Sequence, residues 1–158
     1  MKIYFGSDHA GFEIKRALIP FVQVLGHQAE DLGDFEPDPQ DDYTDFVIPV
    51  ARLVAHDPDN TRGIVIGGSG QGEAMAANRF HDVRAVVFNG QYAPGDGRKM
   101  PNEIELSRMH NNSNVLSLGA RFITEEVAKD AVKLWLATPF SNDERHVRRL
   151  RKMEEMTR

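Results

Sequence analysis

Residues 63–78 read GIVIGGSGQGEAMAAN, in which a continuous apolar run leads into a glycine-rich turn and then into a helical pattern. A short, uninterrupted apolar run is typical of a parallel strand that is buried on both faces. Glycines between such a strand and a helix let the backbone turn tightly and bring several N–H groups toward one point. This stretch therefore predicts a strand–turn–helix unit of an α/β fold, with hydrogen-bond donors gathered at the turn.

Strand-like and helix-like patterns alternate along the rest of the chain. The predicted strands are residues 2–7, 27–33, 63–68, 83–88 and 114–120. The predicted helices are residues 12–26, 43–57, 72–80 and 124–139, followed by a charged C-terminal helix at about 142–157. Regular alternation predicts βαβ units and a parallel sheet, here one α/β domain over residues 1–158 with strand order 2-1-3-4-5. Residues 89–113 fit neither pattern, and their Gly- and Pro-rich first half predicts a long loop.

The composition argues against several classes of protein. The chain has 158 residues, of which 41% are hydrophobic and 27% are charged, as in a globular domain. It contains no cysteine, which excludes disulfides and thiolate metal sites and suggests the cytoplasm. The net charge of −5 argues against nucleic acid as a partner. No apolar run is long enough to cross a membrane, and the first residues, MKIYFGSDH, lack the apolar core of a signal peptide.

The ends of the predicted strands are the expected places for functional residues. Ligands of doubly wound folds bind beyond the carboxyl ends of the strands, where the strand order reverses. Asp8 and His9 follow the first strand, the glycine-rich turn follows the third, and the loop after the fourth ends in His110 and Asn111. With the order 2-1-3-4-5, the first two of these groups face each other across the point of reversal.

The glycine-rich turn fits none of the common phosphate-binding or nucleophile motifs. Glu73 stands where the dinucleotide fingerprint G-x-G-x-x-G needs its last glycine, and Gln71 stands where the nucleophile elbow G-x-S-x-G needs its second. The turn has no lysine for a P-loop, and Glu73 lies four residues after Ser69 instead of the three that a capping box requires. The geometry of the turn must therefore explain both side chains.

Two interpretations of Glu73 remain. In the first, the backbone N–H groups after Ser69 and the helix N-terminus stabilise an oxyanion that forms during a reaction. The carboxylate one turn further on then takes a proton from a carbon atom beside a carbonyl group, which produces an enediolate. In the second, Glu73 is only a favourable acidic residue in the first turn of a helix.

Two loop segments also have a functional and a structural interpretation. Asp8 and His9 form either a helix-capping turn or a contact to sugar hydroxyls and an anion. His110 is either a solvent-exposed loop residue or an acid–base group that opens a sugar ring near neutral pH.

Basic residues cluster near the C-terminus. Arg145 and Arg149 lie four residues apart on one helix face, with His146 alongside, and Arg121 follows the fifth strand. These side chains form either a solvated surface or a clamp for a phosphate group. The six histidines include no i, i+4 pair, so the sequence predicts no metal site.

Together these stretches resemble the ribose-5-phosphate isomerase B family, whose relatives include galactose-6-phosphate and allose-6-phosphate isomerases. The matching stretches are GSDHAGFEIK (6–15), DYTDF (42–46), GIVIGGSGQGEAMAANRF (63–80), RAVVF (84–88), LSRMHNNSNVLSLGAR (106–121) and RHVRR (145–149). They follow the family's order over nearly the whole chain. The resemblance implies a Rossmann-like αβα sandwich, a homodimer or a tetramer with active sites at the dimer interface, a phosphorylated sugar as substrate, and no metal or organic cofactor.

The resemblance also implies a role for each candidate residue. Asp8 and Tyr43 line the sugar site, and Asp8 aids ring opening. His110 opens the ring with Asn111 beside it, and His146 is the alternative for that role. The other residues bind anions: phosphate at His9, Arg121, Arg145 and Arg149, and the enediolate at Ser69 and the amides of Gly70, Gln71, Gly72 and Glu73.

The family divides by its catalytic base. One branch uses a cysteine at the position of Gly68, and the other uses a glutamate at the position of Glu73. Because this chain has no cysteine, it resembles the glutamate branch, which implies interconversion of ribose 5-phosphate and ribulose 5-phosphate through a cis-enediolate. The loop around residues 93–101 is longer than in typical members. Allose 6-phosphate or galactose 6-phosphate is therefore an alternative substrate, and a sugar-phosphate-binding module without turnover is an alternative function.

Overall fold

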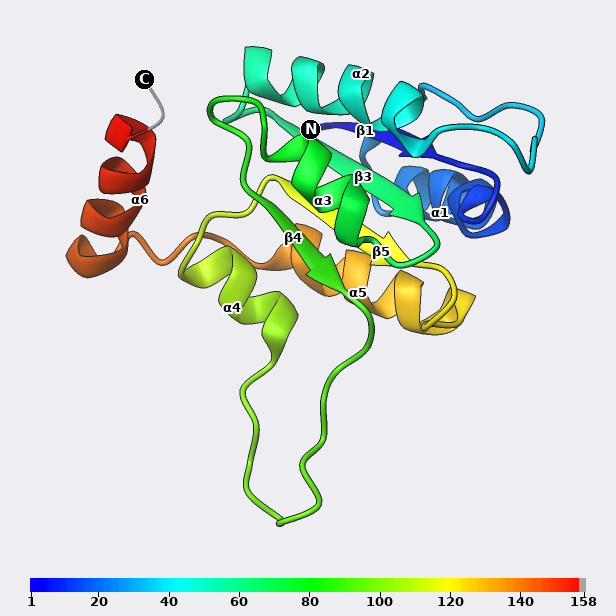
Figure 1. Ribbon diagram of the computed structural model, residues 1–158. Coiled ribbons are helices and arrows are strands. Elements are labelled where there is room, and N and C mark those ends of the chain that lie inside the picture. Colours follow the sequence, from blue (N-terminus) through cyan, green and yellow to red (C-terminus); the bar gives the residue numbers. More distant parts are fainter. Residues whose placement is uncertain (157–158) are drawn as a thin grey trace.

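The computed structural model describes residues 1–156, which form five strands and six helices (Figure 1). The strands are β1 (Lys2–Ser7), β2 (Gln28–Asp31), β3 (Thr61–Gly67), β4 (Ala85–Phe88) and β5 (Val115–Gly119). The helices are α1 (Phe12–Val24), α2 (Tyr43–His56), α3 (Gln71–Ala77), α4 (Glu103–Met109), α5 (Glu125–Ala137) and α6 (Glu144–Met156). All the predicted elements are present within a few residues, and residue 157, at the end of the predicted C-terminal helix, lies outside the described residues.

The strands form one parallel sheet, but its order differs from the prediction. The observed order is β2-β1-β3-β5-β4, so the expected 2-1-3-4-5 is wrong in its last two positions. All five residues of β5 are buried, whereas the first three of β4 are only partly buried, as an edge strand allows. The crossover through α3 leaves room for one strand between β3 and β4, and β5 later fills it. Both strands are short and apolar, so their sequences do not distinguish the central position from the edge.

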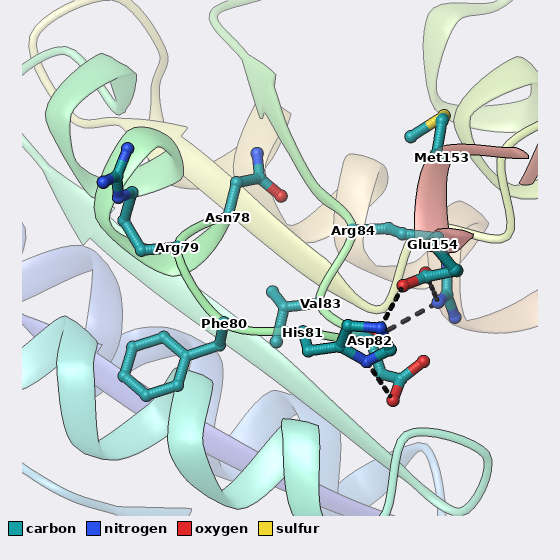
Figure 2. A pocket seen from close by; sticks show the side chains of 9 residues that line it. All are labelled: Asn78, Arg79, Phe80, His81, Asp82, Val83, Arg84, Met153 and Glu154. Atoms are coloured by element: carbon teal, nitrogen blue, oxygen red, sulfur yellow. Dashed lines mark hydrogen bonds and ion pairs between the residues drawn. The ribbon is translucent and has the colours of Figure 1, made fainter. Parts of the chain in front are cut away.

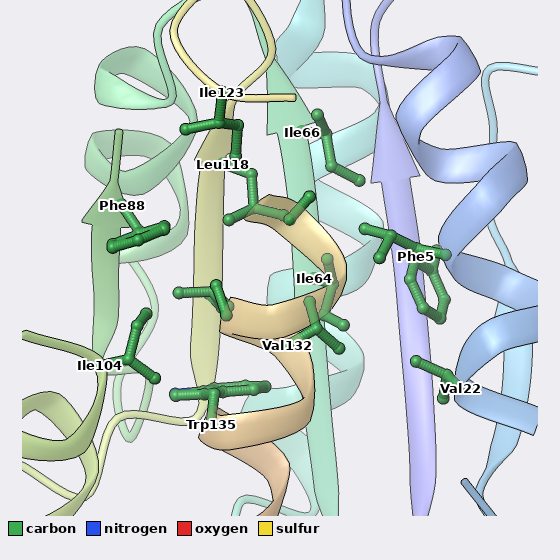
Figure 3. Close-up of a cluster of buried hydrophobic side chains, with 14 of the residues drawn as sticks. Phe5, Val22, Ile64, Ile66, Phe88, Ile104, Leu118, Ile123, Val132 and Trp135 are labelled. Carbon is green, nitrogen blue, oxygen red and sulfur yellow. The ribbon is translucent and has the colours of Figure 1, made fainter. Parts of the chain in front are cut away.

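The sheet lies between two layers of helices, which confirms the expected αβα sandwich. Ile3 and Phe5 of β1 point to one face and Tyr4 to the other, because successive side chains of a strand alternate. On the first face the sheet packs against α1, α4 and α5, including the almost fully buried Trp135 (Figure 3). On the second face it packs against α2 and α3. Because all the strand pairs are parallel, the five strands end at the same edge of the sheet.

Helix α4 was not predicted, and it determines where the segment after it, which begins with His110, lies. Its N-cap is Asn102, whose side chain accepts hydrogen bonds from the backbone N–H groups of Ile104 and Glu105. An asparagine followed by acidic residues in the first turn is a helix-start signal that the sequence did contain. Between β4 and α4 the chain projects from the body as a long loop (Figure 1). The long loop predicted for the first half of residues 89–113 is therefore confirmed, and the helix lies in the second half.

Helix α6 stands apart from the sandwich (Figure 1). His146 is its buried residue, and most of its other side chains are exposed. None of the described helices is long and apolar enough to span a membrane.

Candidate active site

The glycine-rich turn begins where β3 ends at Gly67, and it leads into α3. Gly70 has φ of +73°, a left-handed conformation that glycine adopts without strain. The side chain of Glu73 folds back over the end of β3, so a Cβ atom added at Gly67 would lie 1.7 Å from its Oε1. Only glycine at position 67 leaves space for this carboxyl group. The strand end and the helix start thus hold the carboxyl group in one place.

Glu73 is 4% exposed, and its Oε2 accepts no hydrogen bond from any described residue. Burial raises the pKa of this carboxyl group, and the nearby charge of Asp8 raises it further. An exposed acid in the first turn of a helix would have neither property. The geometry therefore favours the interpretation of Glu73 as a proton acceptor over that of a simple first-turn acid.

Asp8 lies across from this turn, because β1 and β3 are neighbours in the sheet. Its Oδ1 accepts hydrogen bonds from the N–H groups of Ala10 at 3.0 Å and Gly11 at 3.2 Å, as in a helix-capping turn. Burial raises the pKa of Asp8. The predicted juxtaposition of the first-strand and third-strand groups is correct, since β1 and β3 keep their expected places.

His9 is paired with an aspartate that the sequence did not single out. Its Nδ1 lies 2.5 Å from Oδ1 of Asp41, and its backbone N–H donates to Oδ2 of the same carboxylate at 2.9 Å. The hydrogen bond with Asp41 raises the pKa of His9, which favours the imidazolium form. Asp41 lies in an acidic loop with several other aspartates, so nothing in the local pattern marks it.

Arg121 and Tyr43 cover the glycine-rich turn. A Cβ atom at Gly68 would lie 3.0 Å from the guanidinium carbon of Arg121, and one at Gly72 would lie 2.8 Å from the hydroxyl oxygen of Tyr43. The charge of Arg121 is also close enough to lower the pKa of His9. The carboxyl edge of the sheet therefore combines a carboxylate, a donor-rich turn, an imidazole and a guanidinium group around one surface.

His110 and Asn111 lie at the opposite edge of the sheet from the glycine-rich turn, so the expectation that the segment after the fourth strand lies beyond the carboxyl ends of the strands is wrong for these two residues. They follow α4, which has already returned the chain to the amino ends of the strands. Four residues after His110, Oδ1 of Asn114 accepts a hydrogen bond at 2.7 Å from the N–H of Arg84, just before β4. The error follows directly from the missed helix.

The C-terminal candidates join His110 at this amino edge. The rings of His110 and His146 stack with their centroids 4.2 Å apart and an interplanar angle of 11°. His146 is 3% exposed, and burial, followed by the charges of His110 and Arg145, lowers its pKa. Arg145 and Arg149 are exposed on the same helix. The half-exposed His110 is thus the member of the stack that a ligand can reach.

A pocket between α6 and the turn from α3 to β4 shows how this helix is attached (Figure 2). Glu154 of α6 lies 3.3 Å from the guanidinium group of Arg84 and 3.4 Å from Nε2 of His81. The Nδ1 of His81 lies 2.7 Å from Asp82. These ion pairs hold α6 against the amino end of β4 with little apolar packing.

Within residues 1–156, two groups of side chains have the spacing that a metal ion needs. They are Asp8, His9 and Asp41 at the carboxyl edge, and His81, Asp82 and Glu154 at the amino edge. Each histidine already pairs with a carboxylate through Nδ1, so the same contacts are accounted for by hydrogen bonding. Neither group has the i, i+4 histidine spacing considered in the sequence, and the expectation of a metal-free site stays a prediction.

Known proteins are similar to this chain over nearly its whole length. The model of the Ribose/Galactose Isomerase family matches residues 3–153. This chain belongs to that family. It is 39% identical to "Ribose-5-phosphate isomerase B" of Mycolicibacterium paratuberculosis, over 100% of this chain and 92% of the relative. It is 35% identical to the protein of the same name in Escherichia coli, over 94% of this chain and 91% of the relative.

Solved structures of the family have the same fold. Ribose-5-phosphate isomerase B from Mycoplasma genitalium, with bound ribulose-5-phosphate, superposes with a TM-score of 0.89 and 32% identity, covering 98% of this chain and 95% of the other. The enzyme from Clostridium thermocellum gives a TM-score of 0.86 and 36% identity, over 99% and 97% of the two chains. The family predicted from the sequence is confirmed, while the roles of individual residues stay predictions.

Proposed function

We propose that this protein is an aldose–ketose isomerase that interconverts ribose 5-phosphate and ribulose 5-phosphate. The observation that carries the proposal is the buried carboxyl group of Glu73. Its Oε2 accepts no hydrogen bond from a described residue, and Glu73 lies in the first turn of α3, just after the glycine-rich turn whose N–H groups can bind an anion. The names of the relatives and the ribulose-5-phosphate bound to the Mycoplasma genitalium enzyme support the same substrate.

Glu73 acts as the base in this reaction. It removes the proton from C2 of the open-chain aldose, and the electrons of that C–H bond form the C1–C2 double bond of a cis-enediolate. The backbone N–H groups after Ser69 stabilise the negative charge on the enediolate oxygens. Glu73 then returns the proton to C1, while a hydroxyl proton moves from O2 to O1, which gives the ketose. A raised pKa suits this role, because a carboxylate with a higher pKa is a stronger base.

The other residues of the carboxyl edge hold the substrate. Asp8 and Tyr43 face the sugar hydroxyls, and Asp8 assists ring opening. His9 and Arg121 bind the phosphate, since the pairing of His9 with Asp41 favours its positive charge. No metal ion or organic cofactor takes part in these steps.

The site is completed by a second copy of the chain in a homodimer. His110, which opens the furanose ring, lies at the amino edge of the sheet with Asn111, Arg145, His146 and Arg149, away from Glu73 of the same chain. An isologous dimer brings the amino edge of one copy to the carboxyl edge of the other and so forms two equivalent sites. The exposed apolar residues Val147 and Met153 of α6 are available for such a contact.

The test is turnover of defined sugar phosphates by the full chain. We expect a higher kcat/KM for ribose 5-phosphate than for allose 6-phosphate, together with incorporation of solvent deuterium at C2 of the aldose. A preference for allose 6-phosphate would instead assign a six-carbon substrate, which the projecting loop between β4 and α4 could accommodate. Binding of ribose 5-phosphate without any deuterium exchange would identify a binding module and contradict the proposed activity.

A further inference from the structure

Consecutive carbonyl groups of the glycine-rich turn all point in the same direction, toward the carboxyl ends of β4 and β5. Each accepts one hydrogen bond from that side. The four pairs are Gly67 O with Ala120 N at 2.8 Å, Gly68 O with Arg121 N at 3.1 Å, Ser69 O with Asn89 Nδ2 at 3.0 Å, and Gly70 O with Ser117 Oγ at 2.7 Å. In a regular strand successive carbonyls alternate sides, so this run is a local departure from strand geometry.

The direction of the carbonyls determines the direction of the amides. In a planar trans peptide the N–H of one residue points opposite to the C=O of the residue before it. The N–H groups of residues 68–71 therefore point away from β5, toward the surface that Arg121 and Tyr43 cover, where that of Gln71 also donates to Oγ of Ser69 at 3.3 Å. Successive N–H groups with a common direction form an anion-binding concavity.

Main-chain groups supply two of these hydrogen bonds, and side chains supply the other two. Ser117 is 0% exposed in the middle of β5. Asn89 follows β4, and a Cβ atom at Gly119 would lie 2.1 Å from its Oδ1 and 2.8 Å from the carbonyl oxygen of Ser69. The asparagine amide thus lies flat against the end of β5. Both side chains contact the back of the turn, behind the amides that face the substrate.

We infer that Asn89 and Ser117 are positioning residues, which aim the N–H groups of Gly70 and Gln71 at the enediolate. This inference rests on the proposed isomerase activity. Each side chain holds the carbonyl of one peptide unit, and the N–H of that unit is the donor for the developing charge. Loss of the Asn89 hydrogen bond frees the peptide unit between Ser69 and Gly70 to rotate, so the charge is stabilised less while the sugar and phosphate contacts remain in place. The carbonyl of Gly70 also accepts a hydrogen bond from Ala74 N at 3.1 Å, so loss of the Ser117 hydrogen bond should loosen its peptide unit less.

The test compares Asn89→Ala and Ser117→Ala with the unaltered protein. We expect kcat to fall about tenfold in Asn89→Ala and less in Ser117→Ala, and KM to stay within about twofold in both. Two inhibitors distinguish a loss of enediolate stabilisation from a general loss of substrate binding. A phosphorylated hydroxamate that imitates the planar enediolate should bind about tenfold more weakly to Asn89→Ala, whereas ribitol 5-phosphate, which has no carbonyl, should bind as before. Asn89→Asp should lower kcat further, because a carboxylate oxygen would face the carbonyl of Ser69.

Asn78→Ala is the matched control. Asn78 also bonds backbone groups of β4, since its amide donates to Ala85 O at 3.0 Å and its Oδ1 accepts from Ala85 N at 2.7 Å. These bonds lie at the opposite end of the strand, so their loss should lower the melting temperature and leave kcat and hydroxamate affinity nearly unchanged.

The outcomes separate this inference from the proposed function. If Asn89→Ala and Ser117→Ala keep the kcat of the unaltered protein, or lose hydroxamate and ribitol 5-phosphate affinity equally, the positioning role is wrong and the isomerase activity stands. If the unaltered protein turns over no pentose phosphate, the proposed function fails and the inference fails with it.

Discussion

The two edges of the sheet hold two separate groups of candidate residues, and they differ in how those residues are supported. At the carboxyl edge, Asp8 directly follows the buried strand β1, and Glu73 lies in the first turn of α3, after the short turn that follows β3. At the amino edge, His110 ends a short helix, and Arg149 lies on α6, which ion pairs attach to the body. The base Glu73 and the donor-rich turn thus lie beside the central strands, whereas His110, Arg145 and Arg149 lie on peripheral elements.

This difference agrees with the proposal that each edge supplies one part of a site shared between two copies. A base and an anion hole must be held in a fixed geometry, because a small displacement lowers the rate strongly. A phosphate clamp tolerates more movement, since long guanidinium side chains reach their ligand in several conformations. The following experiments test whether the two edges have these separate roles and whether they meet across two copies.

The largest effect is expected at the carboxyl edge, for Glu73→Gln. The variant should keep its affinity for ribose 5-phosphate and lose at least about 10²-fold in kcat, the scale of a lost general base. Steady-state kinetics and substrate binding to the inactive variant measure both quantities. Glu126→Gln is the control, because Glu126 is an exposed acid in the first turn of α5 and should be neutral. Similar behaviour of both variants would return Glu73 to the role of a first-turn acid.

The second experiment tests whether the two edges meet between copies. Glu73→Gln and His110→Asn should each be nearly inactive, but after mixing and subunit exchange about one quarter of the normal activity should return, because half of the dimers contain one intact site. Activity of the mixture is compared with that of each variant alone. No recovery, with exchange confirmed by mass-tagged subunits, would contradict a site that is shared between copies.

The third experiment weakens phosphate binding at the amino edge alone. Arg149→Ala should raise the KM for ribose 5-phosphate about tenfold and change kcat little, since one charge-assisted contact to phosphate is lost. Arg151→Ala serves as the control, because the exposed Arg151 lies 3.6 Å from Glu155 and is assigned no ligand. An unchanged KM in Arg149→Ala would make this helix face a solvated surface.

The smallest effect concerns the pH dependence of stability. The pKa of Glu73 is raised above its ordinary value of 4.5, so the folded chain binds this proton more tightly than the unfolded chain does. The free energy of unfolding therefore falls as the pH rises above 4.5. Glu73→Gln removes this loss, so it should melt at a higher temperature than the unaltered protein at neutral pH, and the difference should disappear below about pH 4.

At the amino edge, the free energy of unfolding should depend on pH in the opposite direction. The pKa of His146 is lowered below its ordinary value of 6.5, so the folded chain releases a proton that the unfolded chain retains. Stability is then lost as the pH falls below 6.5, and His146→Gln should remove that loss. Thermal melts at pH 5 and pH 8 measure both variants. The same pH trend for Glu73→Gln and His146→Gln would show that the two edges are not electrostatically distinct.

Much of the carboxyl edge could be predicted from the sequence, because its signals are local. The apolar run before Gly67, the glycines that follow it, and the acid at position 73 all lie within one stretch. The facing position of Asp8 followed from the rule that parallel strands share one carboxyl edge. His9 was also identified, but its partner Asp41 was not, since that contact joins residues 32 positions apart.

The amino edge was predicted less well, for one identifiable reason. The cap at Asn102 was missed, so the segment that ends in His110 was expected beyond the carboxyl end of the fourth strand. A single helix of seven residues takes His110 to the amino ends of the strands instead. An error in one local element thus became an error in the position of this segment.

The sequence by itself determined the family, the alternation of strands and helices, and the residues that bear the chemistry, because periodicity and glycine content are properties of neighbouring positions. The tertiary structure decided that β5 lies between β3 and β4, that the carbonyls of the turn face Asn89 and Ser117, and that His110 lies away from Glu73. These features depend on which segments pack together after each crossover. The apolar residues of two short strands can fill either position, so only the packing of the whole sheet selects one.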